Sequence, residues 1–169
     1  MSRARAVAAL AATAFAGSAT TAVSAVGHER GDHRGDHRGE ALLKTSLAPE
    51  VPSDPVLNGA IPGNAPWVLK RGEARLARDG DFRVSLRGLV IPVAPANGTP
   101  GPVVTVSASL YCGAATTATG TTPSVPISRA GNADMFGHFR VPAKCLAPTV
   151  LIHPNGAAGA YIAASGFGA

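Results

Sequence analysis

Glycine and proline interrupt this chain so often that long helices are excluded over most of its length. The 169 residues include 20 glycines and 14 prolines, and only 5% of the residues are aromatic. Both residue types disfavour helix interiors, whereas short strands joined by turns accommodate them readily. With few aromatic residues, the core has to be built from Val, Leu, Ile and Ala. We therefore expect a single all-β domain.

From Trp67 onward, apolar residues recur at every second position. Phe82, Val84 and Leu86 alternate with polar neighbours, and residues 104–111 repeat the pattern. This alternation, with a turn signal every few residues, predicts an antiparallel β-sandwich of about seven to nine short strands over residues 67–168, immunoglobulin-like or similar. A small β-barrel is the alternative. Beyond a hairpin at residues 73–87, strands are expected at 89–93, 104–111, 114–119, 123–128, 133–141, 149–153 and 160–165.

The hairpin turns at the sequence Arg78-Asp79-Gly80-Asp81. A two-residue loop would place Leu76 opposite Arg83 and mix apolar and charged side chains on one face. A three-residue loop or a bulge keeps the apolar sets together. We expect this longer loop, with Leu76 opposite Val84.

Three arginines, Arg75, Arg83 and Arg87, share the outward face of the hairpin. In the expected register Glu73 faces Arg87, and Arg75 faces Ser85. Such a face attracts anionic polymers, for example the phosphates of wall polysaccharides. The more ordinary interpretation, which we favour, is a solvated sheet face whose charges discourage edge pairing. The three arginines are retained as a candidate patch for an anionic polymer.

The N-terminal residues 1–25 resemble a secretory signal peptide. Arg3 and Arg5 precede a short apolar stretch, and Val23-Ser24-Ala25 fits the small-residue rule for cleavage. We expect a secreted, extracellular protein without a membrane span in its mature form. The twelve Arg against three Lys, together with abundant Ala, indicate a high-GC bacterial genome rather than a nucleic-acid partner.

Residues 26–40 contain the tetrapeptide Gly-Asp-His-Arg twice in tandem and are predicted to be a disordered arm. A proline-rich, extended lead-in follows at 41–66. Cleavage after Ala25 would leave a chain beginning Val26-Gly27-His28. Its amine, two amide nitrogens and the His28 imidazole could then hold Cu(II) or Ni(II) in a square plane. The alternative is a hydrophilic spacer that binds no cofactor.

Cys112 and Cys145 are the two cysteines of the chain. In an exported protein an even number of cysteines predicts a disulfide. The competing interpretation, a metal site, lacks any Cys-x-x-Cys or Cys–His spacing. The bridge would close a loop of about 34 residues, which the chain-entropy model values at about 3.7 kcal/mol.

The common catalytic motifs do not occur in this sequence. It has no Gly-x-Ser-x-Gly elbow, no His-Glu-x-x-His, no P-loop and no dinucleotide fingerprint. A Ser–His–Asp triad could be assembled on paper from Asp134 with His138 or His153, but almost any secreted domain permits that. We assign no catalytic residue; whether the protein is an enzyme stays open, and the sequence argues against it.

A series of short motifs runs through residues 47–166: Ala48-Pro49, Val51-Pro52, Asp54-Pro55, Ala65-Pro66-Trp67-Val68-Leu69, Gly88-Leu89-Val90-Ile91-Pro92, Cys112, Cys145-Leu146-Ala147-Pro148 and Pro154-Asn155-Gly156. With these motifs, the segment resembles small secreted proteins of unknown function from high-GC Gram-positive bacteria. That resemblance implies a secreted domain and transfers no activity. We expect a non-catalytic secreted or cell-envelope-associated domain that binds a cell-wall polymer or another extracellular protein, or has a structural role. The alternatives are a secreted hydrolase with an unrecognised site and a metal-handling protein acting through its His-rich arm.

Overall fold

A computed structural model describes residues 40–167, which form strands, turns and loops and contain no helix. The all-β prediction is confirmed. Accordingly, no helix in this part of the chain is long and apolar enough to cross a membrane. The strands are β1 (Ala41–Pro49), β2 (Ile61–Pro62), β3 (Arg71–Ala77), β4 (Asp81–Arg87), β5 (Thr105–Cys112), β6 (Gly120–Thr121), β7 (Val125–Pro126), β8 (Ala133–His138), β9 (Pro148–Pro154), β10 (Ala160–Tyr161) and β11 (Ala163–Ser165).

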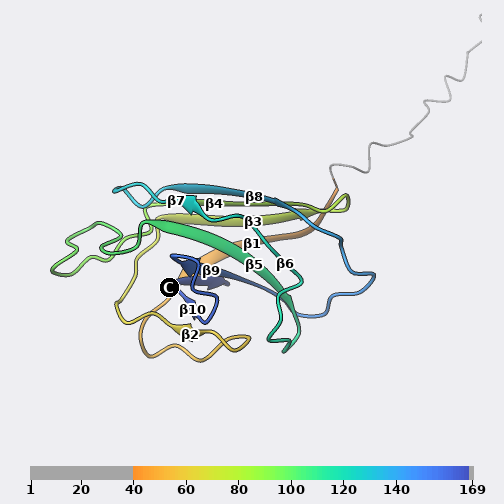
Figure 1. Ribbon diagram of the computed structural model, residues 1–169, viewed down its shortest axis with the longest axis horizontal. Coiled ribbons are helices and arrows are strands. Elements are labelled where there is room, and N and C mark those ends of the chain that lie inside the picture. Colours follow the sequence, from red (N-terminus) through yellow and green to blue (C-terminus); the bar gives the residue numbers. More distant parts are fainter. Residues whose placement is uncertain (1–39, 168–169) are drawn as a thin grey trace, which may run out of the picture. The chain divides into compact units, whose positions relative to one another are not determined.

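Nine of these strands form one antiparallel sheet in the order β6-β5-β9-β11-β1-β3-β4-β8, with β7 also paired to β5. The sheet curls so that β3, β4 and β8 form one layer and β5 and β9 another (Figure 1). At the seam between the two ends of the sheet, the Phe139 ring packs on Gly120, and Thr122 lies against Gly137. The result is a sandwich nearly closed into a barrel. β2 and β10 form a separate parallel pair.

The main core lies between the two layers. Side chains from β3, β4 and β8 meet those of β5 and β9 there, and the Phe82 and Phe139 rings pack with centroids 5.4 Å apart. A second, smaller cluster lies on the opposite face of β5 and β9 and contains Ala60, Tyr111, Leu151 and Tyr161. The β5–β9 pair is therefore buried on both faces.

The β3–β4 hairpin has the expected three-residue loop but not the expected pairing. Leu76 pairs with Phe82, and Val84 pairs with Ala74, so the predicted partnership of Leu76 with Val84 is wrong by two residues. Because side chains alternate with a period of two, this shift leaves every residue on its predicted face. Gly80, with φ +98°, closes the loop by donating its N–H to the Ala77 carbonyl.

Two other strand predictions fail, and strands β1, β2 and β6 were not predicted. Residues 114–119 form turns, because Gly113 reverses the chain and the Asn58 side chain binds the carbonyls of Gly113 and Ala115. Residues 89–93 make only isolated bridges. Conversely, the start of the predicted lead-in is strand β1, which lies inside the sheet between β3 and β11.

Cys112 and Cys145 form a disulfide, with their Cα atoms 5.1 Å apart. This confirms the predicted pairing. Cys112 ends β5 opposite Pro148 of β9. The bridge therefore fastens the connection between β8 and β9 to the end of the doubly buried strand pair.

Candidate functional site

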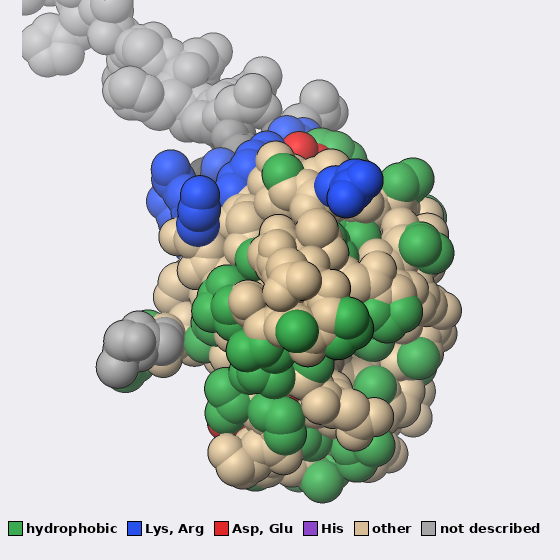
Figure 2. Space-filling view, turned by 90° about the vertical axis from the view of Figure 1, so that its left-hand side faces the viewer, with side chains coloured by type: hydrophobic (Ala, Val, Ile, Leu, Met, Phe, Trp, Pro, Cys, Tyr) green, Lys and Arg blue, Asp and Glu red, His purple; other side chains and the backbone are tan. Residues whose placement is uncertain are grey.

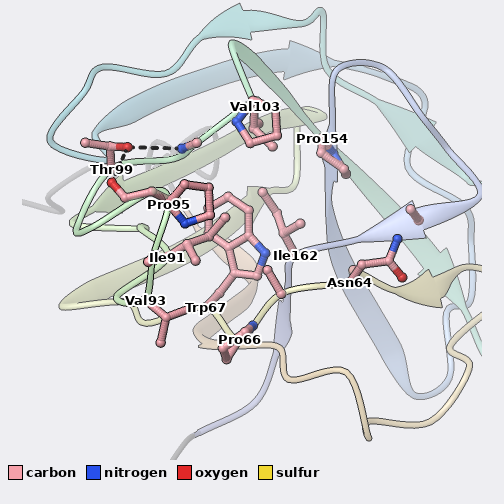
Figure 3. Close-up of a pocket in the computed structure, with 17 residues that line it drawn as sticks. Asn64, Pro66, Trp67, Ile91, Val93, Pro95, Thr99, Val103, Pro154 and Ile162 are labelled. Atoms are coloured by element: carbon pink, nitrogen blue, oxygen red, sulfur yellow. Dashed lines mark hydrogen bonds between the residues drawn. The ribbon is translucent and has the colours of Figure 1, made fainter.

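A cavity of about 780 Å³ opens at one end of the barrel. Three segments form it: residues 63–67, the loop 91–103, and residues 154–162 around β10 (Figure 3). Its volume is in the range that drug-sized ligands occupy in proteins. The lining consists of Gly63, Asn64, Ala65, Pro66, Trp67, Ile91, Val93, Ala94, Pro95, Ala96, Thr99, Gly101, Pro102, Val103, Pro154, Ala160 and Ile162.

Trp67 lies at the centre of the cavity wall, beside Ile91 and Ile162 (Figure 3). The backbone fixes these residues. Trp67 donates its N–H to the Glu50 carbonyl at 3.1 Å, and Ile162 donates to the Ile152 carbonyl at 2.9 Å. Trp67 is only 4% exposed, so its indole is held in the core while it lines the cavity. This wall is preformed.

The loop 91–103 is ordered by its own hydrogen bonds. Ile91 and Gly98 reach across it, with Ile91 N–H bound to the Thr99 carbonyl and Gly98 N–H bound to the Ile91 carbonyl. The Thr99 hydroxyl donates to the Ala96 carbonyl at 2.8 Å and accepts from Gly101 N–H at 3.2 Å. A proline-rich loop fixed in this way makes a stable second wall.

Hydrophobic side chains gather at the surface of the end of the barrel that carries the cavity (Figure 2). Figure 2 looks onto this end: hydrophobic side chains gather over its middle and lower part, whereas Lys and Arg side chains lie along its upper edge. Val93, which lines the cavity, is 49% exposed. Clusters of exposed apolar side chains on soluble domains mark binding surfaces more often than chance.

Glu50 is buried directly beside the cavity. It follows β1 and is 1% exposed, and neither of its carboxyl oxygens has a hydrogen-bond partner within residues 40–167. Burial, and to a lesser degree the negative charge of Asp54, raises the pKa of Glu50 to about 7. The nearby Gly63 N–H opposes this shift, although it donates its hydrogen bond to the Tyr161 carbonyl and makes none of good geometry to Glu50. Buried polar groups are nearly always hydrogen-bonded, so an unpartnered carboxyl with a raised pKa beside a cavity indicates a functional site.

His153 is a second buried ionisable side chain near the cavity, and both of its ring nitrogens have partners. Its Nδ1 donates to the carbonyl of Ala160, a cavity residue, at 2.7 Å, and its Nε2 lies 3.4 Å from the Tyr111 hydroxyl. Burial lowers the pKa of His153, although the bond to Ala160 opposes the shift. The ring is therefore neutral at pH 7 and supports the cavity wall.

The candidate arginine patch is only partly assembled. Arg75 pairs with Arg83 across the hairpin, and Arg71 with Arg87, so the expected pairings of Glu73 with Arg87 and of Arg75 with Ser85 are wrong. Arg87 instead binds both Asp134 oxygens at 2.9 Å.

Arg83 lies over the Phe136 ring, 5.8 Å from its centroid, and 3.6 Å from Asp81. Acidic side chains thus accompany these arginines, as on a solvated face.

The remaining sequence candidates do not form a second site in the described residues. Asp134 binds Arg87, whereas His138 lies 3.0 Å from Asp81 and His153 is buried in the other layer, so the triad on paper is not assembled. Residues 40–167 hold no cluster of three or more His, Cys, Asp or Glu side chains that could bind a metal. The candidate metal ligands Val26, Gly27 and His28 lie outside the described residues.

Neither the cavity nor Glu50 was anticipated from the sequence. Two signals were available. Trp67 is the only tryptophan of the chain and stands between a proline and apolar residues, and Glu50 is the one charge in the apolar stretch 47–52. The sequence did not show that Glu50 and Trp67, which are 17 positions apart, lie close together in the fold.

Comparison with protein-family models, with curated proteins and with solved structures found no match for this chain.

Proposed function

We propose that this chain is a non-catalytic binding domain that holds the apolar part of a small ligand in the cavity at the end of its barrel. The observation that carries the proposal is the cavity itself. It is large, open to the surface, lined mainly by aliphatic, proline and tryptophan side chains, and bounded by walls that internal hydrogen bonds fix. Such a cavity needs no rearrangement to accept an apolar group.

The hydrophobic effect supplies the affinity in this proposal. Burial of each methylene group contributes about 0.8 kcal/mol, so a chain of eight carbons gains roughly 6 kcal/mol before the cost of association is subtracted. The polar atoms at the cavity, those of Asn64, Thr99 and the backbone, would orient the ligand rather than drive its binding.

We further propose that the domain acts outside the cell or at the cell envelope. The signal-like residues 1–25 and the Cys112–Cys145 disulfide support this location, because structural disulfides persist in oxidising compartments. The ligand would then be an apolar constituent of an extracellular molecule, such as a cell-wall polymer or another extracellular protein.

Two matched variants test the proposal with the uncharged fluorescent probe N-phenyl-1-naphthylamine. Val93 lines the cavity, whereas Val104 is 65% exposed and lies outside it. Val93→Arg should weaken probe binding at least tenfold by placing a charge at the cavity mouth, and Val104→Arg should leave it unchanged. Absence of binding to the unmodified protein, or equal effects of the two variants, would refute the proposal.

A further inference from the structure

The carboxyl group of Glu50 and the cavity meet at Gly63. A Cβ atom placed on Gly63 would lie 2.7 Å from Glu50 Oε1, 3.5 Å from Trp67 Nε1 and 3.5 Å from Ile162 Cγ2. Gly63, Trp67 and Ile162 all line the cavity. Because glycine has no side chain, the Glu50 carboxyl can lie against this residue of the cavity wall, although Glu50 itself does not line the cavity.

Backbone hydrogen bonds also join Glu50 to two of the cavity segments. Its N–H donates to the Ile162 carbonyl at 3.2 Å, and its carbonyl accepts from Trp67 N–H at 3.1 Å. The carboxyl is thereby held between residues 63–67 and residues 160–162. Its position is fixed by the same contacts that shape the cavity.

In the described part of the chain, the charged group that acts on Glu50 is the negative Asp54, and no cation does so. Asp54 raises the pKa of Glu50, and both carboxylates contribute to the raised pKa of Tyr161, after burial of its phenol. The other polar groups here are already engaged: Asp54 accepts from Val51 N–H, and the Tyr161 hydroxyl donates to the Pro55 carbonyl. No Lys, Arg or His occurs among the cavity residues. A cation is the partner that this arrangement lacks.

We propose that the cavity binds an apolar primary amine, with its hydrocarbon part against Trp67 and its ammonium group donating hydrogen bonds to the Glu50 carboxylate. This inference rests on the proposed function and names the class of its ligand. Both carboxyl oxygens are covered in the unliganded structure, so the ammonium group reaches them by displacing the backbone at Gly63. A protein molecule whose Glu50 is protonated releases that proton to solvent as the ammonium–carboxylate pair forms.

The proposed ion pair predicts a distinct order of affinities among ligands that share one hydrocarbon chain and differ in their head group. An aliphatic ammonium group stays charged throughout neutral pH, as a lysine side chain does. An alcohol can donate a hydrogen bond but brings no charge, and a carboxylate is repelled by Glu50 and Asp54. Since hydrogen bonds between charged groups are the strong ones, n-octylamine should bind about tenfold more tightly than 1-octanol, and octanoate most weakly.

The single tryptophan, Trp67, reports on the cavity directly. We would titrate the protein with n-octylamine, 1-octanol and octanoate at pH 7.5 and follow tryptophan emission. Glu50→Gln should remove the preference for the amine and leave octanol binding unchanged. Glu73→Gln, which changes a carboxyl on the outer sheet face, is the matched control and should keep the preference.

A second measurement needs no variant. As the pH rises from 6 to 8, Glu50 loses its proton, so the ratio of amine to alcohol affinity should increase about tenfold in the unmodified protein. Equal affinities for amine and alcohol, or an amine preference that persists in Glu50→Gln, would overturn this inference and leave apolar binding intact. Failure of all three compounds to bind would overturn the proposed function as well.

Discussion

The outer faces of the two layers of the barrel differ in their exposure to solvent. In β4, buried Phe82, Val84 and Leu86 alternate with more exposed residues, so one face packs and the other meets solvent. In β5, six consecutive residues from Val106 to Tyr111 are buried, because the second cluster covers its outer face. The polar side chains of the first layer can rely on water, whereas those of the β5–β9 pair need partners within the protein.

Those partners are present around β5 and β9. Ser109 and Thr121 hydroxyls lie 2.8 Å apart, Thr122 accepts from Ala108 N–H, and His153 binds the Ala160 carbonyl. Glu50, equally buried, has none. Buried polar groups in this layer are thus paired within the protein. The unpaired exception, Glu50, lies beside the cavity.

Loss of the disulfide should have the largest effect on the doubly buried layer. Cys112→Ala combined with Cys145→Ala removes the covalent link at the end of β5 and should lower the free energy of unfolding by about 2–5 kcal/mol. Urea unfolding measures this change. A reductant should destabilise the unmodified protein to a similar extent and leave the double variant unaffected. An unchanged midpoint on reduction would contradict the claim.

Glu50 tests whether pairing, and not burial alone, decides stability. The pKa of Glu50 is about 7 in the folded protein and near 4.5 when the chain is unfolded. The contribution of the protonated carboxyl to the free energy of unfolding is therefore fully present below pH 4.5 and is lost as the pH rises through 7. Glu50→Gln removes this loss. At pH 8 it should be more stable than the unmodified protein by about 2–3 kcal/mol, the lower figure allowing for partial hydration of the carboxylate. At pH 4 the two unfolding curves should coincide, and a constant difference across this range would refute the assignment.

Substitution of His153 and of His138 allows a direct comparison of the two layers. His153→Leu leaves the partly buried Ala160 carbonyl without its donor and should cost about 1–3 kcal/mol. His138→Leu changes an exposed residue of β8 and should barely move the unfolding midpoint. Since burial lowers the pKa of His153, the stability that depends on its neutral form is present above about pH 6.5 and declines as the pH falls below it. His153→Leu should lack that decline; equal effects of both variants would show that the layers do not differ.

The layer with one exposed face was predictable from the sequence, and the other was predictable only in part. Alternation in β4 assigned each side chain to its face, but it did not settle which residues pair, since a shift by two residues preserves every face. Ser107 and Ser109 have the parity of a solvent-facing row, yet both are buried. Their burial, like that of Glu50, comes from segments distant in sequence, such as Thr121 for Ser109 and Gly63 for Glu50. No local pattern encodes such contacts.

The smallest effect should come from the ion pair between Arg87 and Asp134 on the exposed layer. The guanidinium group binds both carboxylate oxygens at 2.9 Å and lowers the pKa of Asp134, yet both side chains are nearly half exposed. Such pairs contribute about 0–1 kcal/mol, because water already solvates both charges well. Arg87→Gln should therefore lower the free energy of unfolding by less than about 1 kcal/mol, and the difference should shrink in 1 M salt. A double-mutant cycle with Asp134→Asn isolates the pair from other effects of each substitution. A coupling energy comparable to the cost of His153→Leu would mean that the outer face of β4 depends on internal partners as the β5–β9 pair does.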